Sequence, residues 1–140
     1  MSADPAHFVL DSYALLAFLE DEAGLMRVKE VLNNAEKGRC QVYLSWINLG
    51  EVLYITERER GERTARETLG HIQGLPIQML EANSQAVLAA AHIKAGHRLS
   101  YADAFAVVAA LEKNAILLTG GPEFAAVESV LTIEWLPQKS

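Results

Sequence analysis

Apolar and polar residues alternate along this chain with two different periods. Short apolar runs predict strands at 7–10 (HFVL), 40–45 (CQVYLS), 75–82 (LPIQMLEA) and 115–119 (AILLT), and the alternating segment 131–136 (LTIEWL) predicts an edge strand. The segments between them carry apolar residues at helical spacing, which predicts helices at about 12–20, 22–37, 46–60, 62–73, 84–96 and 100–113.

This alternation of strands and helices is typical of an α/β domain with a mostly parallel sheet. We expect one three-layer domain over residues 1–140, with its core at about 7–136 and a sheet of roughly five strands flanked by helices. In open sheets of this kind, ligands bind beyond the carboxyl ends of the strands, near the point where the strand order reverses.

Three of the apolar segments contain a single acidic residue each. Asp11 interrupts 8–19 (FVLDSYALLAFL), Glu51 interrupts 46–55 (WINLGEVLYI) and Asp103 interrupts 99–111 (LSYADAFAVVAAL). Taking an ionised carboxylate out of water is costly unless it is paired, hydrogen-bonded or bound to a metal. These three acids therefore need an explanation, and Asp11, directly after the first strand, falls on the edge where ligands bind.

Each acid also has a structural explanation. Asp11 is a favoured residue for capping the N-terminus of the first helix. Ser100 and Asp103 have the spacing of a capping box, in which the carboxylate returns to the backbone of the cap residue. Glu51 sits in mid-helix, where no free N–H needs it, and its neighbours one turn away are apolar except for Asn48. The face that carries Glu51 is therefore either buried or functional.

Convergence of the three acids would favour a metal site. Without neutralisation, their mutual repulsion would raise at least one pKa sharply. A divalent cation resolves this repulsion, and oxygen ligands without Cys or paired His favour Mg²⁺ or Mn²⁺ over zinc. The alternative is three unrelated structural roles, with Glu51 buried and paired.

Composition and charge narrow the possible functions. The net charge of −6 argues against a protein that binds nucleic acid through bulk positive charge, so a polyanionic ligand would need a local basic patch or bound cations. The one cysteine, Cys40, excludes an internal disulfide and a Cys-based zinc site, and suits a reducing cytosol. With no apolar run long enough for a membrane span and no signal-peptide pattern, we expect a cytoplasmic protein.

Four segments resemble the motif regions of PIN-domain proteins, especially the VapC-type toxins of toxin–antitoxin pairs. They are VLDSYALLAFL, NLGEVLY, LSYADAFAVVAA and ILLTGGPEF, in that order, and the resemblance spans about residues 7–135. It implies a PIN-like fold and a metal-dependent endoribonuclease, in which water activated by Mg²⁺ or Mn²⁺ attacks the phosphodiester and leaves a 5′-phosphate and a 3′-hydroxyl. By position, the catalytic metal ligands would be Asp11, Glu51 and Asp103, supported by Ser12, Asn48, Ser100, Thr119 and Glu123.

One position departs from the family pattern. The family often has TGDPEF after the fourth strand, whereas this chain has TGGPEF, so that Gly121 replaces the usual fourth acid. Glu123 is the nearest carboxylate, but its reach and direction differ. The alternative to an active nuclease is therefore a catalytically weak or silent PIN-like module that binds a partner or RNA.

Candidate RNA contacts come from two basic segments. Segment 57–67 (ERERGERTARE) contains Arg58, Arg60 and Arg63, which would form a basic lip, or else a solvated helical face with Glu59–Arg63 and Glu62–Arg66 pairs.

The second basic segment is His97–Arg98, which just precedes Ser100. These residues would meet a phosphate, or else simply close the preceding helix.

The resemblance also implies partners. Besides an RNA substrate, it implies a protein antitoxin bound in a groove formed with help from 46–55 and 62–73, and a homodimer.

Overall fold

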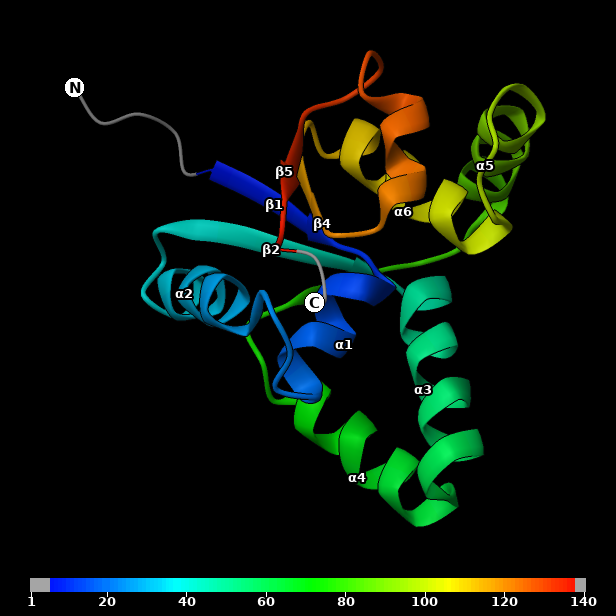
Figure 1. The fold of residues 1–140 in the computed structure, drawn as a ribbon. Coiled ribbons are helices and arrows are strands. Elements are labelled where there is room, and N and C mark those ends of the chain that lie inside the picture. The colour runs from blue at the N-terminus through cyan, green and yellow to red at the C-terminus, as the bar shows by residue number, and fades with distance from the viewer. Residues whose placement is uncertain (1–5, 138–140) are drawn as a thin grey trace.

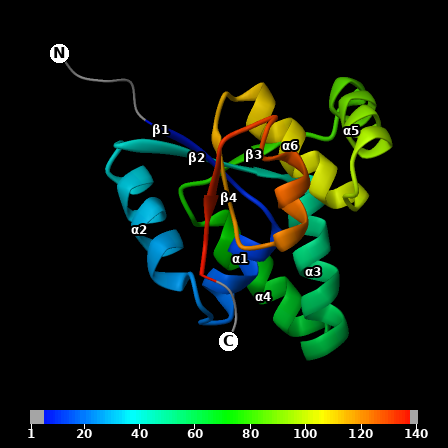
Figure 2. The same ribbon diagram turned by 45° about the horizontal axis from the view of Figure 1, so that its top comes forward.

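The computed structural model describes residues 6–137, and these contain a five-stranded, fully parallel sheet in the order β3-β2-β1-β4-β5 (Figures 1 and 2). The strands are β1 (Ala6–Leu10), β2 (Cys40–Ser45), β3 (Gln78–Leu80), β4 (Ile116–Thr119) and β5 (Ile133–Trp135). The helices are α1 (Ser12–Leu19), α2 (Leu25–Glu36), α3 (Trp46–Arg60), α4 (Glu62–Gln73), α5 (Ser84–Gly96), α6 (Tyr101–Glu112) and the 3₁₀ helix η1 (Pro122–Val127). The predicted α/β class and the edge position of the last strand are confirmed.

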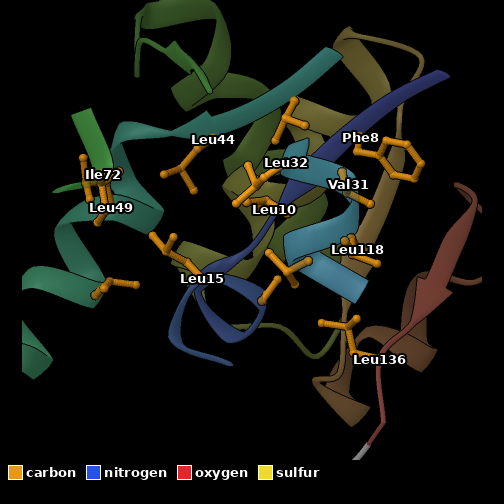
Figure 3. Packing of buried hydrophobic residues seen from close by; sticks show 14 of the residues in the cluster. Phe8, Leu10, Leu15, Val31, Leu32, Leu44, Leu49, Ile72, Leu118 and Leu136 are labelled. Atoms are coloured by element: carbon orange, nitrogen blue, oxygen red, sulfur yellow. The ribbon is translucent and has the colours of Figure 1, made fainter. Parts of the chain in front are cut away.

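Helices cover both faces of the sheet, with α1 to α4 on one side and α5, α6 and η1 on the other (Figures 1 and 2). Along β1, Phe8 and Leu10 face the first side, where they pack with residues such as Leu15 of α1 and Leu49 of α3 (Figure 3). Val9 faces the other side and packs against α6. Burial on both faces explains why HFVL is apolar throughout instead of alternating with polar residues.

The element ends differ from the predicted ones where glycine or proline intervenes. Helix α2 begins at Leu25 and not near residue 22, because Gly24 precedes it with a φ of 98°. Strand β3 begins only at Gln78, two residues after Pro76, which has no N–H for the ladder, and it ends at Leu80. The 3₁₀ helix η1 was not expected after the Gly-Gly-Pro sequence.

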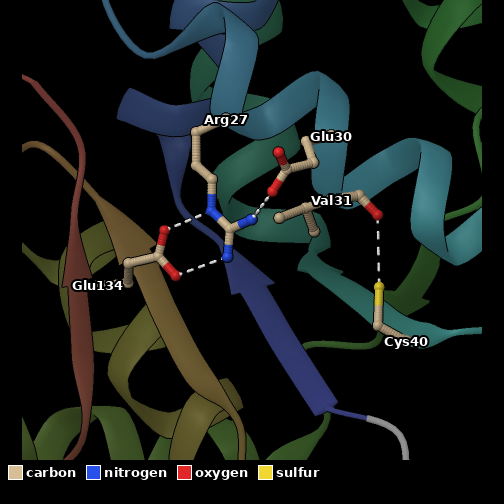
Figure 4. Close-up of polar contacts among 5 residues, drawn as sticks. All are labelled: Arg27, Glu30, Val31, Cys40 and Glu134. Atoms are coloured by element: carbon tan, nitrogen blue, oxygen red, sulfur yellow. Dashed lines mark hydrogen bonds and ion pairs between the residues drawn. The ribbon is translucent and has the colours of Figure 1, made fainter.

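Two side-chain contacts fasten α2 to the sheet (Figure 4). The Arg27 guanidinium donates to both oxygens of Glu134 on β5, with Nε–Oε2 at 2.6 Å and Nη2–Oε1 at 2.9 Å. Buried Cys40 donates from Sγ to the Val31 carbonyl at 3.4 Å. Within residues 6–137, no helix has both the length and the apolar character needed to cross a membrane.

Candidate active site

The acidic residues gather at the carboxyl end of the sheet, beside the pair β1 and β4. From β1 the chain continues to β2 on one side, and from β4 it continues to β5 on the other, so the strand order reverses between these two neighbours. Asp11 follows β1 directly and Thr119 ends β4. The Thr119 hydroxyl donates to Asp11 Oδ2 at 2.5 Å, across the reversal point where α/β sheets bind ligands.

Asp11 is 2% exposed and also caps α1, because its Oδ1 accepts a hydrogen bond from the Ala14 N–H at 2.9 Å. The structural role proposed for it is therefore real, but it does not neutralise the carboxylate. Burial raises the pKa of Asp11 to about 7; the bonds from Thr119 and Ala14 oppose this shift, and the charges of Asp103 and Glu123 add to it.

Asp103 occupies the first turn of α6 and is partly buried. Ser100 caps the helix, accepting at Oγ from the Asp103 N–H at 3.1 Å, as in the predicted capping box. Burial raises the pKa of Asp103 to about 6, with a further rise from the charge of Glu123 and a smaller one from Glu51, against a lowering contribution from Ser100.

Asn48, fully buried, joins the three chain segments that carry the acids. Its Nδ2 donates to Ser12 Oγ at 3.3 Å and to the Ala102 carbonyl at 3.1 Å, and Ser12 Oγ donates back to the Asn48 carbonyl at 3.3 Å. Ser12 follows Asp11, Ala102 precedes Asp103, and Glu51 lies one turn further along α3. Asn48 Oδ1 is buried without a hydrogen-bond partner among residues 6–137.

Glu51 and Glu123 lie at the open side of this cluster. Glu51 is partly buried on α3, on a face that also carries Tyr54, which is 56% exposed, and Glu123 is exposed in η1. Within residues 6–137, none of these four carboxylates forms an ion pair with Lys, Arg or His. The cluster therefore keeps uncompensated negative charge at the ligand-binding edge of the sheet.

The donor atoms suit a hard divalent cation, since they are carboxylate oxygens in the same network as the unpartnered Asn48 Oδ1. In the described part of the chain, however, no three Asp, Glu, His or Cys side chains stand close enough together to hold one ion. Glu51 is partly buried and Glu123 is exposed, so the side chains of these two acids are the ones with room to change rotamer.

The basic segment around Gly61 lies away from the acids. Arg63 pairs with Glu67 at 3.4 Å, and not with Glu59 as expected, while the predicted Arg66–Glu62 pair is present at 2.6 Å. These residues flank the junction of α3 and α4, which projects away from the sheet (Figure 1).

Two further arginines of this segment also have partners. Arg60 reaches Glu20 at 3.8 Å, and Arg58 lies over the Tyr54 ring at 5.6 Å. Arg58 is seven residues beyond Glu51, or about 10 Å along the helix axis. This geometry favours the solvated helical face over the basic lip.

His97 and Arg98 link α5 to the cap of α6. His97 ends α5, with its Nδ1 at 2.9 Å from the Ile93 carbonyl oxygen. Arg98 is exposed, two residues before Ser100. Of the candidate RNA contacts, these two are the ones nearest in sequence to an acidic residue of the cluster.

The sequence carries no signal for the role of Tyr13. Its ring lies against Gly120 so closely that a Cβ at residue 120 would overlap it, and its hydroxyl donates to the Pro137 carbonyl at 3.3 Å. Tyr13 follows Asp11 by two residues, and its ring contacts Gly120, the residue after Thr119. It therefore connects the chain after β1 to the chain after β4.

Solved structures share this fold at low sequence identity. DNA-bound VapBC from Salmonella typhimurium has a TM-score of 0.72 at 18% identity, covering 92% of this chain and 97% of that chain. VapBC2 from Rickettsia felis, bound to a fragment of its promoter, has a TM-score of 0.70 at 14% identity, with coverage of 94% and 99%. VapC20 from Mycobacterium tuberculosis, a toxin that cleaves the sarcin–ricin loop, has a TM-score of 0.68 at 16% identity, with coverage of 86% and 94%.

No curated protein sequence matches this one significantly. A family model for the PIN domain does match, over residues 8–130. That range runs from β1 to the loop before β5 and includes all four carboxylates of the cluster. The resemblance found in the motifs is thereby confirmed, and the chain belongs to the PIN-domain family.

Proposed function

We propose that this protein is a metal-dependent endoribonuclease of the VapC toxin type. Asp11, Glu51 and Asp103 would hold Mg²⁺ or Mn²⁺, with Glu123 beside them. The observation that carries the proposal is a pair of carboxylates at the strand-order reversal, buried Asp11 and partly buried Asp103. Neither forms an ion pair with a cationic side chain within residues 6–137. Family membership supports a nuclease at the level of the family.

The chain's own groups hold Asp11 ready to bind a ligand. Ala14 N–H fixes Oδ1 and the Thr119 hydroxyl fixes Oδ2, so each carboxylate oxygen accepts one hydrogen bond and keeps a lone pair for a ligand. Asn48 sets the spacing between the segments of Asp11 and Asp103. A divalent cation bound here would lower the pKa of water and offset the negative charge of the phosphodiester.

For RNA contacts we propose Arg98 and His97 ahead of Arg58, Arg60 and Arg63. Arg98 is exposed and joined to the site through Ser100, and it forms no ion pair within residues 6–137. The three arginines near Gly61 have an acidic or aromatic partner each.

We also propose a protein antitoxin and a second copy of this chain as partners, in the cytoplasm. Structures of VapBC pairs are among those that share the fold. Exposed Tyr54 on α3 offers an apolar contact on the helix that the resemblance assigns to the antitoxin groove.

Cleavage of end-labelled single-stranded RNA tests the proposed activity. The full chain should cut with Mg²⁺ or Mn²⁺ and stop cutting with EDTA, and Asp11→Asn should abolish cutting. Asp21→Asn is the matched control, because Asp21 is exposed and Asn tolerates its φ of 54°. Metal-independent cutting, or full activity in Asp11→Asn, would contradict the proposal.

The second candidate is a silent binding module, favoured by the absence of a carboxylate at residue 121. For such a module, the folded chain would cut none of several RNAs with either metal, and Gly121→Asp would produce a large gain of cleavage.

A further inference from the structure

The side chain of Glu123 fills the space that Gly121 leaves empty. Gly121 has φ −73° and ψ 115°, an extended conformation that any residue adopts, so the backbone does not require glycine there. A Cβ at residue 121 would nevertheless overlap Glu123 Oε1, and it would lie 3.1 Å from Glu123 Cδ and 3.3 Å from Phe124 Cδ2. The carboxyl group of Glu123 therefore folds back to the place where a side chain of residue 121 would start.

The loop that carries Glu123 is anchored to Asp11. Gly121 N–H donates to Thr119 Oγ1 at 3.0 Å, and the same hydroxyl donates to Asp11 Oδ2 at 2.5 Å. On the other side, Phe124 N–H donates to the Gly121 carbonyl at 3.1 Å, and the Phe124 side chain is 1% exposed in the core. Glu123 thus stands between two fixed residues, although its own side chain is open to solvent.

The Glu123 carboxyl group lies against Gly121, and two hydrogen bonds through the Thr119 hydroxyl join Gly121 to Asp11. The fold of this loop therefore brings the Glu123 carboxylate to the same edge of the sheet as Asp11.

We propose that Glu123 is the fourth carboxylate of the divalent-cation site, and that Gly121 is the residue that admits it. This inference rests on the proposed function and adds a ligand to the same site. If so, the TGGPEF segment still supplies a carboxylate to the site. The carboxylate comes from Glu123, two residues beyond the usual position, and Gly121 has no side chain to obstruct it.

Metal binding tests this directly, with Mn²⁺ affinity of the full chain measured by calorimetry and independently of cleavage. Glu123→Gln should weaken Mn²⁺ binding about tenfold, since affinity for hard cations follows the number of charged ligands. Gly121→Ala should weaken it similarly, because the new Cβ displaces the Glu123 carboxylate while the backbone conformation suits alanine. Combining the two substitutions should add little further loss.

Glu128→Gln is the matched control, since Glu128 is exposed at the end of the same 3₁₀ helix and should leave Mn²⁺ affinity unchanged. Unfolding of each variant in EDTA shows whether the fold is kept. Gly121→Asp should bring no gain in Mn²⁺ affinity with Glu123 present, because the two carboxylates would compete for one place. Gly121→Asp combined with Glu123→Gln should recover most of the affinity lost in Glu123→Gln.

Several results would overturn the proposal. If wild type binds Mn²⁺ and Asp11→Asn does not, but Glu123→Gln binds as wild type does, then the proposed function stands and the role of Glu123 is wrong. The same holds if Gly121→Ala weakens binding and Glu123→Gln does not. If wild type itself binds no Mn²⁺, the proposed function fails, and the role of Glu123 fails with it.

Discussion

Two regions beside the sheet contain charged side chains, and they differ in whether those charges are balanced by opposite charges of the chain. At the side of β5, Arg27 meets its countercharge within the chain: it donates twice to Glu134, also pairs with Glu30, and lies over the Phe8 ring at 5.7 Å (Figure 4). Both Arg27 and Glu134 keep 34% of their side-chain surface exposed.

At the carboxyl end of β1, the charges are alike and more deeply buried. Asp11 is almost inaccessible, and the charges that act on it most strongly come from Asp103 and Glu123, both acids. A cluster of opposite charges stabilises the fold without outside help, whereas a cluster of like charges gains stability only from a bound cation or proton. The contrast is the one expected between a structural ion pair and the ligand site proposed above.

The largest expected effect is a pH dependence that comes from the acidic cluster alone. In the folded protein the pKa of Asp11 is about 7, above the ordinary value of about 4. Between these values the folded state binds more protons than the unfolded state, so the free energy of unfolding falls as pH rises, by up to about 4 kcal/mol.

Urea unfolding in EDTA at pH 5 and pH 8 measures the part of this fall that lies between those pH values, about 3 kcal/mol for a folded-state pKa of about 7. Asp11→Asn should remove most of it and be the more stable form at pH 8, and added Mg²⁺ should stabilise wild type at pH 8. Equal stability of wild type at both pH values would remove the distinction between the two regions.

A second prediction concerns Asn48, which carries no charge but links the chain segments of the acidic residues. Asn48→Ala removes the hydrogen bonds to Ser12 and to the Ala102 carbonyl, and should lower the free energy of unfolding by about 2 kcal/mol. Because the acids then lose their spacing, Mn²⁺ affinity should fall as well. Asn33→Ala, on the exposed face of α2, is the control. If Asn48→Ala binds Mn²⁺ as tightly as wild type, then Asn48 serves stability only.

A smaller effect is expected from the opposite region. Glu134→Gln keeps the shape of the side chain but removes its charge, and should cost about 1 kcal/mol, as half-exposed ion pairs of good geometry do. Mn²⁺ affinity should stay unchanged, since this pair lies by the outer strand β5 and contacts none of the four carboxylates. A change in Mn²⁺ affinity comparable to that of Glu123→Gln would show that the two regions are coupled.

The smallest effects concern the arginines. Arg98→Ala should weaken RNA binding and reduce the slope of log affinity against log salt by about 1, the loss of one phosphate contact. Arg63→Ala should leave this slope unchanged, because Arg63 pairs with Glu67 on a solvated face. The reverse result would favour the basic lip around Gly61 over the link at Arg98.

Hydrophobic periodicity was enough to predict the order and type of the main elements. It failed at local exceptions: the positive φ of Gly24 delays α2, and β3 begins only at Gln78, after Pro76. The capping roles of Asp11 and Ser100 were also predictable, since they depend on residues three positions apart.

The remaining features of the site depend on contacts between distant segments. The bond from Thr119 to Asp11 requires β4 to pair with β1, and the link from Asn48 to Ala102 requires α3 to lie beside α6. The return of Glu123 over Gly121 depends on the fold of the loop after β4, where Phe124 is buried in the core and its N–H donates to the Gly121 carbonyl. No local pattern in the sequence encodes these contacts.

The hydrogen bond between Thr119 and Asp11 has a consequence for the synthesis of this protein. It joins residues 108 positions apart, and it depends on pairing between the first strand and the fourth. A ribosome that has made the first hundred residues has therefore synthesised every helix up to α5, but not β4, which carries Thr119. An unfinished chain thus has no assembled cluster, and a truncation before Thr119 leaves a fragment without the site, however much of its helical structure has formed.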